Sequence, residues 1–457
     1  MLTIQSLHRA LLASCLLGCL PARAGSAIST PATPGIPETP ASTATGLLLG
    51  KFTGESAYDR IWSAFTLYKD ENNPVLQEFS LQGRLQLQYA DGNSDDGHFD
   101  IDDFKNGSAS NAQSVWGDHL EARRAYLGFK SKWYQNWKLE GQIDVDTTDG
   151  MGNFYRNIYD LYLVYAPSDA LNVTVGKVEV KFGREQEISS KEILTIERSL
   201  VSNLLYPGEL TGIKANGKGI AEHWLYDLGV YSNDRAREFA NLSQGAIILG
   251  KIGYDYSAQT GLDTAVASLQ YLHNTAPGYK EQNDDNFYAS GSPSFSDSIA
   301  LTNDITHGRF GLTTDILYGF GYKGNAEQAG TTTAINQSDV FGISIIPSYY
   351  IADGLQLVGR VQWATSGDVH PKHGSTPATS NLGLPNRYEK WAPNVIPNGD
   401  HYTSFYLGLN YYLYGHKLKI MNGIEYSMMD GGIANAGKKQ TASYDGYTFF
   451  SGLRFSF

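Results

Sequence analysis

Basic residues recur at the polar positions of segments in which polar and apolar side chains alternate. Successive side chains of an extended segment point to opposite faces, so these residues share one wet face. Fixed charges on the wall of a water-filled passage attract ions of opposite sign, which is the chemistry this pattern can do. By alternation alone, the basic set on the wet face is Arg84, Arg124, Lys138, Lys251, Arg309, Arg360 and Arg454. The acidic set on the same faces is Glu140, Asp144, Asp146, Asp227, Asp255 and Asp315. A mixed lining predicts weak ion selectivity.

No group of residues in the sequence predicts catalysis or metal binding. Nucleophilic catalysis needs a nucleophile, a histidine and an acid that converge, and the ten histidines are scattered. His370 and His373 lie in a proline-containing loop, where solvated side chains are the simpler interpretation. We therefore expect no enzyme activity, no cofactor and no metal site.

The alternating segments predict strands, because a helix cannot carry a two-residue period. Residues 79–90 are the clearest case, with Leu81 and Leu85 on one face and Arg84 and Gln86 on the other. The predicted strands are 79–90, 119–130, 136–147, 157–166, 170–178, 209–217, 222–232, 245–256, 263–274, 298–306, 308–320, 339–351, 355–365, 401–413, 416–428 and 446–457. The segments 209–217 and 298–306 are the weakest of the sixteen, so fourteen or eighteen strands stay open.

These strands predict a transmembrane antiparallel β-barrel of about sixteen strands over residues 79–457. No stretch after residue 24 approaches the roughly 18 to 20 apolar residues that a membrane helix needs. A closed barrel is the other way to span a bilayer without unpaired backbone groups. The segment 446–457 alternates in the same way and reaches the aromatic Phe457, which is typical of the last strand of an outer-membrane barrel. Sixteen strands leave room for an aqueous channel.

The first residues predict export. Arg9 precedes an apolar stretch, and Ala22 and Ala24 supply small residues for signal-peptide cleavage after residue 24. Residues 16–19, which include Cys19, also resemble a lipobox, so a lipidated cysteine stays open as an alternative. Residues 25–54 are rich in Pro, Thr and Ser and predict a disordered leader. Within 55–78, apolar residues at helical spacing predict a short amphipathic periplasmic helix.

Bulk charge argues against a nucleic-acid binder. The chain has 35 basic and 47 acidic residues, and removing Arg9 and Arg23 with the signal leaves 33 against 47, a net charge of −14. Thirty tyrosines and a mean hydropathy of −0.31 are typical of a barrel, in which lipid-facing and water-facing residues cancel along each strand.

Four stretches resemble the phosphate-selective porin O/P family of outer-membrane channels. They are 123–130 (Arg-Arg-Ala-Tyr-Leu-Gly-Phe-Lys), 171–177 (Leu-Asn-Val-Thr-Val-Gly-Lys), 189–200 and 228–233 (Leu-Gly-Val-Tyr-Ser-Asn). The resemblance implies a sixteen-stranded barrel that forms a homotrimer. It also implies a third outer loop folded inward to narrow the pore, and a basic lining that selects phosphate.

The segment 180–208 has the length that such a constriction loop requires. Its basic residues are Lys181, Arg184, Lys191 and Arg198. Two interpretations stay open, because these cations either face the lumen or pair with the nearby Glu185, Glu187, Glu192 and Glu197.

The sequence therefore predicts a porin of the bacterial outer membrane through which small hydrophilic solutes and ions diffuse, with anions or phosphate as candidates. Expected partners are outer-membrane lipid, lipopolysaccharide and the barrel assembly machinery, for which Phe457 is the expected signal. An alternative is a sugar channel with an aromatic track formed by Tyr162, Tyr231, Tyr406 and Tyr412. A further alternative is a barrel with a blocked lumen, either a membrane-embedded enzyme or a structural barrel.

Overall fold

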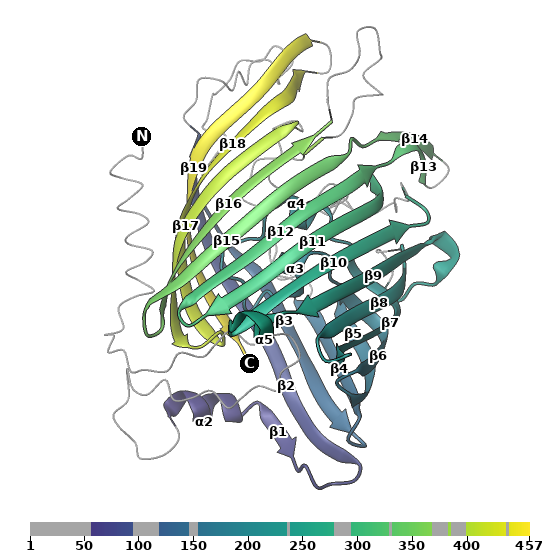
Figure 1. The fold of residues 1–457 in the computed structure, drawn as a ribbon, viewed down its shortest axis with the longest axis vertical. Helices are drawn as coiled ribbons and strands as arrows, with labels where there is room; N and C mark the ends of the chain where they lie inside the picture. The colour runs from purple at the N-terminus through teal and green to yellow at the C-terminus, as the bar shows by residue number, and fades with distance from the viewer. Residues whose placement is uncertain are drawn as a thin grey trace.

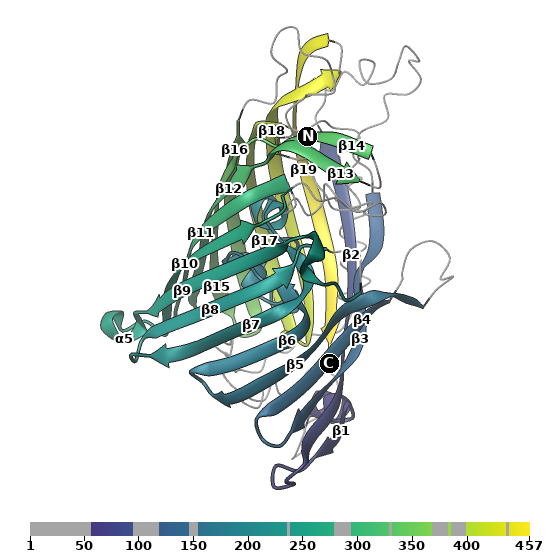
Figure 2. The same cartoon turned by 90° about the vertical axis from the view of Figure 1, so that its right-hand side faces the viewer.

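Sixteen antiparallel strands pair in chain order, and the last pairs with the first, so the sheet closes into a barrel (Figures 1 and 2). The structure, a computed structural model, describes residues 56–94, 118–145, 154–234, 238–277, 294–328, 331–367, 383–384, 399–435 and 438–457. The predicted signal peptide 1–24, with Cys19, and the predicted leader 25–54 lie outside the described residues.

The barrel strands match the sixteen predicted segments one for one, including the two weakest. The alternative counts of fourteen and eighteen strands are therefore wrong. The strands are β2 (Leu76–Ser94), β3 (Asp118–Trp133), β4 (Trp137–Val145), β5 (Tyr155–Ser168), β6 (Leu171–Val180), β7 (Gly208–Ile220), β8 (Trp224–Ser232), β9 (Ala246–Asp255), β10 (Thr264–Asn274), β11 (Phe295–His307), β12 (Phe310–Gly321), β15 (Val340–Ala352), β16 (Leu355–Ser366), β17 (His401–Tyr414), β18 (Leu418–Asn435) and β19 (Lys438–Ser456).

The alternation of side chains separates an outer apolar face from a polar lumen. On β16 and β17, Leu357 pairs with Leu409 and Val361 with Phe405, and all four side chains are exposed on the outside. The intervening Arg360 is buried on the inner side. This split places the apolar residues where lipid covers them and the polar residues where they meet each other, the loops or water.

Short turns lie at one end of the barrel and longer connections at the other. Tyr134 and Gln135, between β3 and β4, both have positive φ, as a tight hairpin turn requires. The short connection between β9 and β10 holds α5 (Ser257–Thr260). The longer connections carry η2 (Leu242–Gln244) and a hairpin of β13 (Lys323–Gln328) and β14 (Thr331–Asn336), which the sequence did not predict.

The segment before the barrel differs from the predicted helix over 55–78. α2 spans Ala57–Ser63, and β1 (Thr66–Lys69) follows and pairs with β2. The barrel itself starts at Leu76. The apolar stripe at helical spacing was misleading because α2 ends at Ser63 and the last residue of the stripe, Tyr68, belongs to β1. Pairing with β2 outweighs a short helical pattern.

Two absences hold for the residues that the structure describes. No helix among them is long and apolar enough to cross a membrane. No group of three or more His, Cys, Asp or Glu among them is placed to hold a metal ion.

Candidate functional site

The chain between β6 and β7 folds into the barrel, as Figure 1 shows for the two short helices within it. We call residues 181–207 the inward loop. It contains α3 (Arg184–Glu187) and α4 (Leu200–Leu204). Its amides reach strands far from its own: Gly183 donates to Gln270 on β10 at 2.9 Å, and Leu200 donates to Gln362 on β16 at 2.8 Å. The inward loop therefore crosses the lumen and narrows it.

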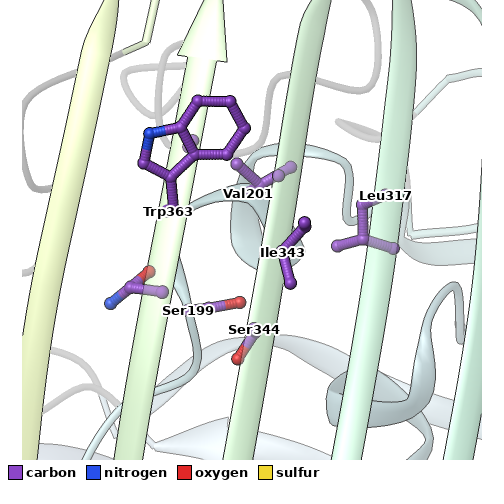
Figure 3. A pocket seen from close by; sticks show the side chains of 9 residues that line it. Ser199, Val201, Leu317, Ile343, Ser344 and Trp363 are labelled. Atoms are coloured by element: carbon purple, nitrogen blue, oxygen red, sulfur yellow. The ribbon is translucent and has the colours of Figure 1, made fainter.

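Glycines in the wall form hollows that seat apolar side chains of the inward loop. A Cβ added at Gly342 on β15 would lie 2.6 Å from a methyl group of Val201, so only glycine leaves Val201 its place. Figure 3 shows Val201 against the strands that carry Leu317, Ile343 and Trp363. The other seats are Gly319 under Leu205 and Gly452 under Ile196.

Wall side chains also hold the backbone of the inward loop between its helices. Residues 190–198 have no helix or strand there, so their buried carbonyls need donors from elsewhere. The donor pairs are Gln86 Nε2 to Ser190 O (2.8 Å), Lys419 Nζ to Ile193 O (2.7 Å), Asn410 Nδ2 to Leu194 O (2.8 Å), Arg454 Nη2 to Ile196 O (2.7 Å) and Arg360 Nη1 to Glu197 O (2.5 Å).

These contacts correct part of the predicted pore lining. Arg84, Arg360 and Arg454 lie on the inner face, as alternation predicted, but they are only 7%, 3% and 1% exposed. The inward loop covers them, and Arg84 donates to the Ser190 hydroxyl. They anchor the loop instead of facing open water, a role that strand alternation could not reveal because it depends on where the loop docks.

The other predicted lining residues divide between the inward loop and the short-turn end of the barrel. Lys251 contacts Glu187 of the inward loop, and Arg124 lies at its opposite side near Glu197. Lys138 is exposed beside the β3–β4 turn, and Arg309 lies in the β11–β12 turn, 3.5 Å from Asp353. Lys138 and Arg309 are therefore at the short-turn end, away from the inward loop.

A β-bulge supplies a residue that the sequence analysis missed. Gln86 on β2 pairs with Arg124, but the next residue pairs with Ala122, so Arg123 is an extra residue in β3. The bulge lets Arg123 and Arg124 both turn inward. Strict alternation would have placed one of two adjacent arginines in lipid, which is costly, so the Arg-Arg pair was itself the missed signal.

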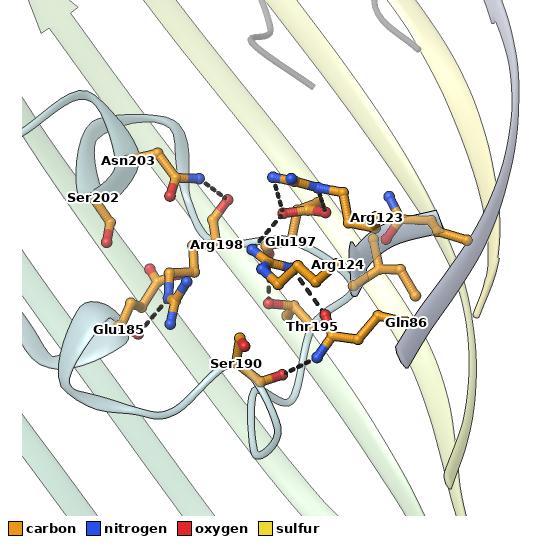
Figure 4. Close-up of polar contacts among 12 residues, drawn as sticks. Gln86, Arg123, Arg124, Glu185, Ser190, Thr195, Glu197, Arg198, Ser202 and Asn203 are labelled. Atoms are coloured by element: carbon orange, nitrogen blue, oxygen red, sulfur yellow. Dashed lines mark hydrogen bonds and ion pairs between the residues drawn. The ribbon is translucent and has the colours of Figure 1, made fainter. Parts of the chain in front are cut away.

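Both bulge arginines hold one carboxylate of the inward loop (Figure 4). Arg123 Nε lies 2.7 Å from Glu197 Oε1, and Arg124 Nη2 lies 3.8 Å from Oε2. Burial alone would raise the pKa of the Glu197 carboxyl, but the two guanidinium groups outweigh it and lower that pKa to about 2. Glu197 is therefore ionised at every pH at which the protein would normally work.

Five arginines gather at this end of the inward loop. Arg124 and Arg454 donate to the same oxygen of Gln86, and Arg198 lies nearby and donates to two backbone carbonyls of the inward loop. We call this group the arginine cluster: Arg84, Arg123, Arg124, Arg198 and Arg454. Carboxylates accompany the arginine cluster: Glu197, Glu121 at 4.0 Å from Arg123, and Glu179 and Asp160, whose charges interact with Arg84.

The four predicted loop cations have different surroundings. Arg184 lies 2.7 Å from Asp304 and 3.6 Å from Glu187, and Lys181 lies 3.9 Å from Glu179. The remaining two are Arg198, in the arginine cluster, and the half-buried Lys191. Arg184 with Glu187 is one pair of the kind that the second interpretation expects, a loop cation with a glutamate of the loop.

The opposite end of the inward loop meets an acidic wall. Asp315 on β12 accepts from the amides of Arg184 at 2.7 Å and Glu185 at 2.8 Å, so its carboxylate caps α3. Asp304 on β11 and Glu187 of the loop itself lie on the same side. The inward loop thus spans from the arginine cluster on β2, β3 and β19 to carboxylates on β11 and β12.

The chain matches the phosphate-selective porin O and P family over residues 92–338, more than half of its 457 residues. The chain belongs to this family. It is an outer-membrane porin, and its inward loop is the feature that narrows the channel. A comparison with the curated proteins gives no match.

Solved structures of three bacterial proteins are similar to the porin. OmpF of Salmonella typhi, in complex with daunomycin, is 11% identical with a TM-score of 0.50, over 86% of this chain and 100% of that one. DcaP of Acinetobacter baumannii is 14% identical with a TM-score of 0.46, over 86% and 100%. OprB of Pseudomonas putida is 12% identical with a TM-score of 0.48, over 83% and 94%. At these identities the likeness concerns the fold alone.

The tyrosines expected of a sugar channel do not form a track along the lumen of the porin. Tyr231 and Tyr406 are 1% and 4% exposed, and the Tyr406 ring lies over Gly408 and Gly423 of the wall. Tyr162 and Tyr412 donate to wall side chains, Glu140 and Gln356. These rings pack against the wall and leave no row of open faces for a sugar to stack on.

Proposed function

We propose that this porin is a passive channel, and not an enzyme, that passes small hydrophilic solutes with a preference for anions, phosphate included. The double-arginine bulge carries the proposal, because Arg123 and Arg124 both face the lumen and share Glu197. Their side chains are 21% and 11% exposed, so a passing ion can approach them. Two adjacent guanidinium groups that stay partly open to a narrow, low-dielectric passage attract anions although the protein as a whole is acidic.

The preference for anions is weak because carboxylates lie on the far side of the inward loop. Asp304 and Asp315 face α3 from the wall, with Glu187 between Arg184 and Lys251. A passing anion meets attraction on one side and repulsion on the other. Such a lining supports diffusion of anions better than tight binding of phosphate.

The reversal potential of single channels in a KCl gradient tests the preference. We expect a potential of the sign that chloride flux gives, several-fold smaller than that of an ideal anion channel. A cation-selective reversal potential would reject the proposal. Phosphate added at millimolar concentration should reduce the chloride current modestly. A block of the current at micromolar phosphate would reject the proposal that phosphate binds weakly.

We also propose a homotrimer in which part of the apolar outer face contacts the neighbouring subunits and the rest contacts lipid and lipopolysaccharide. The exposed apolar side chains on every part of the barrel support it, among them Leu127, Ile213, Leu301 and Leu407. Mass measurement of the detergent-solubilised porin should give three chains per particle. A particle of one chain at all protein concentrations would count against the trimer.

The role of Phe457 in assembly stays a prediction. Its amide and carbonyl both pair with Gly83, so it forms part of the seam between β19 and β2. Deleting Phe457 should lower the amount of heat-modifiable, folded barrel in outer membranes, with the unfolded chain accumulating instead. An unchanged folded fraction would remove Phe457 as a signal for the barrel assembly machinery.

A further inference from the structure

The seam of the barrel is completed by a segment from outside it. β19 pairs with β2 down to Gly83, where Gly83 and Phe457 exchange two backbone hydrogen bonds of 3.0 Å. Alternate residues of a strand turn their amides to the same neighbour, and the Leu81 amide on that same side donates to Phe65 O at 2.8 Å. β1 therefore continues the line of β19 along β2. The pairs below Leu81 are Thr66 with Ser80, Tyr68 with Phe79 and Lys69 with Glu78.

Side chains join the two pieces of this composite strand. The rings of Phe65 and Phe457 stack with centroids 3.9 Å apart. Trp62 of α2 is 8% exposed, donates its indole N–H to Ser456 O at 2.7 Å and lies 4.8 Å from the ring of Tyr414. We call residues 56–69 the arm. Figures 1 and 2 both show β1 beyond the short-turn end of the barrel, outside the lumen.

The seat of the arm exists only in a closed barrel. It is built from β2 at one end of the sequence and from β17 and β19 at the other, which come together when the seam forms. Without the arm, the lower part of β2 would present an unpaired strand edge, a template for pairing with another chain.

We propose that the lower edge of β2, from Glu78 to Leu81, is a strand-acceptor site whose occupant is the chain's own residues 65–69, and that the arm locks the seam of the closed barrel. The site accepts an extended peptide by β-augmentation: backbone pairing supplies affinity, and the ring of Phe457 selects an aromatic residue at the first position. Neither the inward loop nor the ion preference takes part.

A peptide supplied in trans tests the acceptor site directly. The variant protein lacks residues 25–69 but keeps the signal peptide, and the probe is a labelled synthetic peptide of residues 56–70. We expect this peptide to bind the truncated porin and to bind the full-length porin, whose own arm fills the site, at least tenfold more weakly. A peptide with Phe65→Ala should bind the truncated porin weakly. Equal binding to both proteins, or none to the truncated one, would overturn the proposal.

Point variants test the lock if the truncated chain does not assemble. Trp62→Phe keeps an aromatic ring but removes the hydrogen bond to Ser456 O, and Phe65→Ala removes the stack on Phe457. Loss of one buried hydrogen bond should speed thermal unfolding of the barrel about fivefold, and loss of the stack should speed it further. Ile61→Ala, at an exposed position of α2, is the matched control. Single-channel conductance should stay unchanged in all three. Unfolding rates equal to the parent for both Trp62→Phe and Phe65→Ala would refute the lock.

Discussion

Arginines of the same wall face have two different roles in this porin, according to whether the inward loop covers them. Arg360 is 3% exposed, pairs with Glu425 at 3.0 Å and donates to the backbone of the inward loop. Arg123 and Arg124 lie at the edge of the loop, where their side chains stay partly open to the lumen. A cation that the loop covers fixes the position of the loop, and we propose that a cation at its edge sets the field that a solute meets.

Removal of the covered cation Arg360 should have the largest effect. Arg360→Met leaves the buried Glu425 without its cationic partner, which should cost about 3–5 kcal/mol of folding free energy. Urea unfolding of the detergent-solubilised barrel measures it. Adding Glu425→Gln should recover much of the loss, because the unpaired buried charge is then gone. A single variant as stable as the parent would show that Arg360 is no anchor.

Filling the hollow at Gly342, in which Val201 of the inward loop packs, should have the next largest effect. Gly342→Val places methyl groups where Val201 lies, so the loop should move off the wall and single-channel conductance should change by a large fraction. Gly250→Val is the matched control, since a Cβ there would meet only Leu228, at 3.8 Å. Equal conductance in Gly342→Val and the parent would mean that the loop does not bound the channel.

A substitution beside Arg123 and Arg124, at the edge of the inward loop, should have a smaller effect. Glu197→Gln removes the carboxylate between Arg123 and Arg124, so the anion preference in reversal-potential measurements should increase. The stabilising effect of an acid with a lowered pKa is present above its ordinary pKa and is lost as the pH falls through the lowered value. With that pKa at about 2, parent channels should keep the charge of Glu197 between pH 8 and pH 4. A parent that already behaves like Glu197→Gln at pH 5 would contradict this account.

The strands were predictable because alternation is a local signal. Each of the sixteen segments carries its own period of two, so even 209–217 and 298–306 are strands in the structure. The arm was not predictable in this way. Ile61 belongs to the apolar stripe but is 52% exposed, while Phe65 is drawn into pairing with β2. Contacts between residues far apart in the sequence decided its structure, such as the hydrogen bond from Trp62 to Ser456, 394 residues away.

The candidate site was predictable only in part. Alternation placed Arg84, Arg360 and Arg454 correctly on the inner face but could not show that the inward loop covers them. It also missed Arg123, because a bulge breaks the period at that residue. A strict two-residue period cannot show where the inward loop docks or where a bulge inserts an extra residue.

We propose that Arg123 and Arg124 set the ion preference, and removal of charge at two places tests this role most directly. Arg123→Gln/Arg124→Gln should shift the single-channel reversal potential toward cations, because Glu197 and Glu121 are then left with less opposing charge. Lys138→Gln/Arg309→Gln removes the same charge at the short-turn end, where solvent screens it within about 10 Å at 0.1 M salt, and should scarcely change the potential. Equal shifts in the two double variants, or no shift in the first, would contradict the claim.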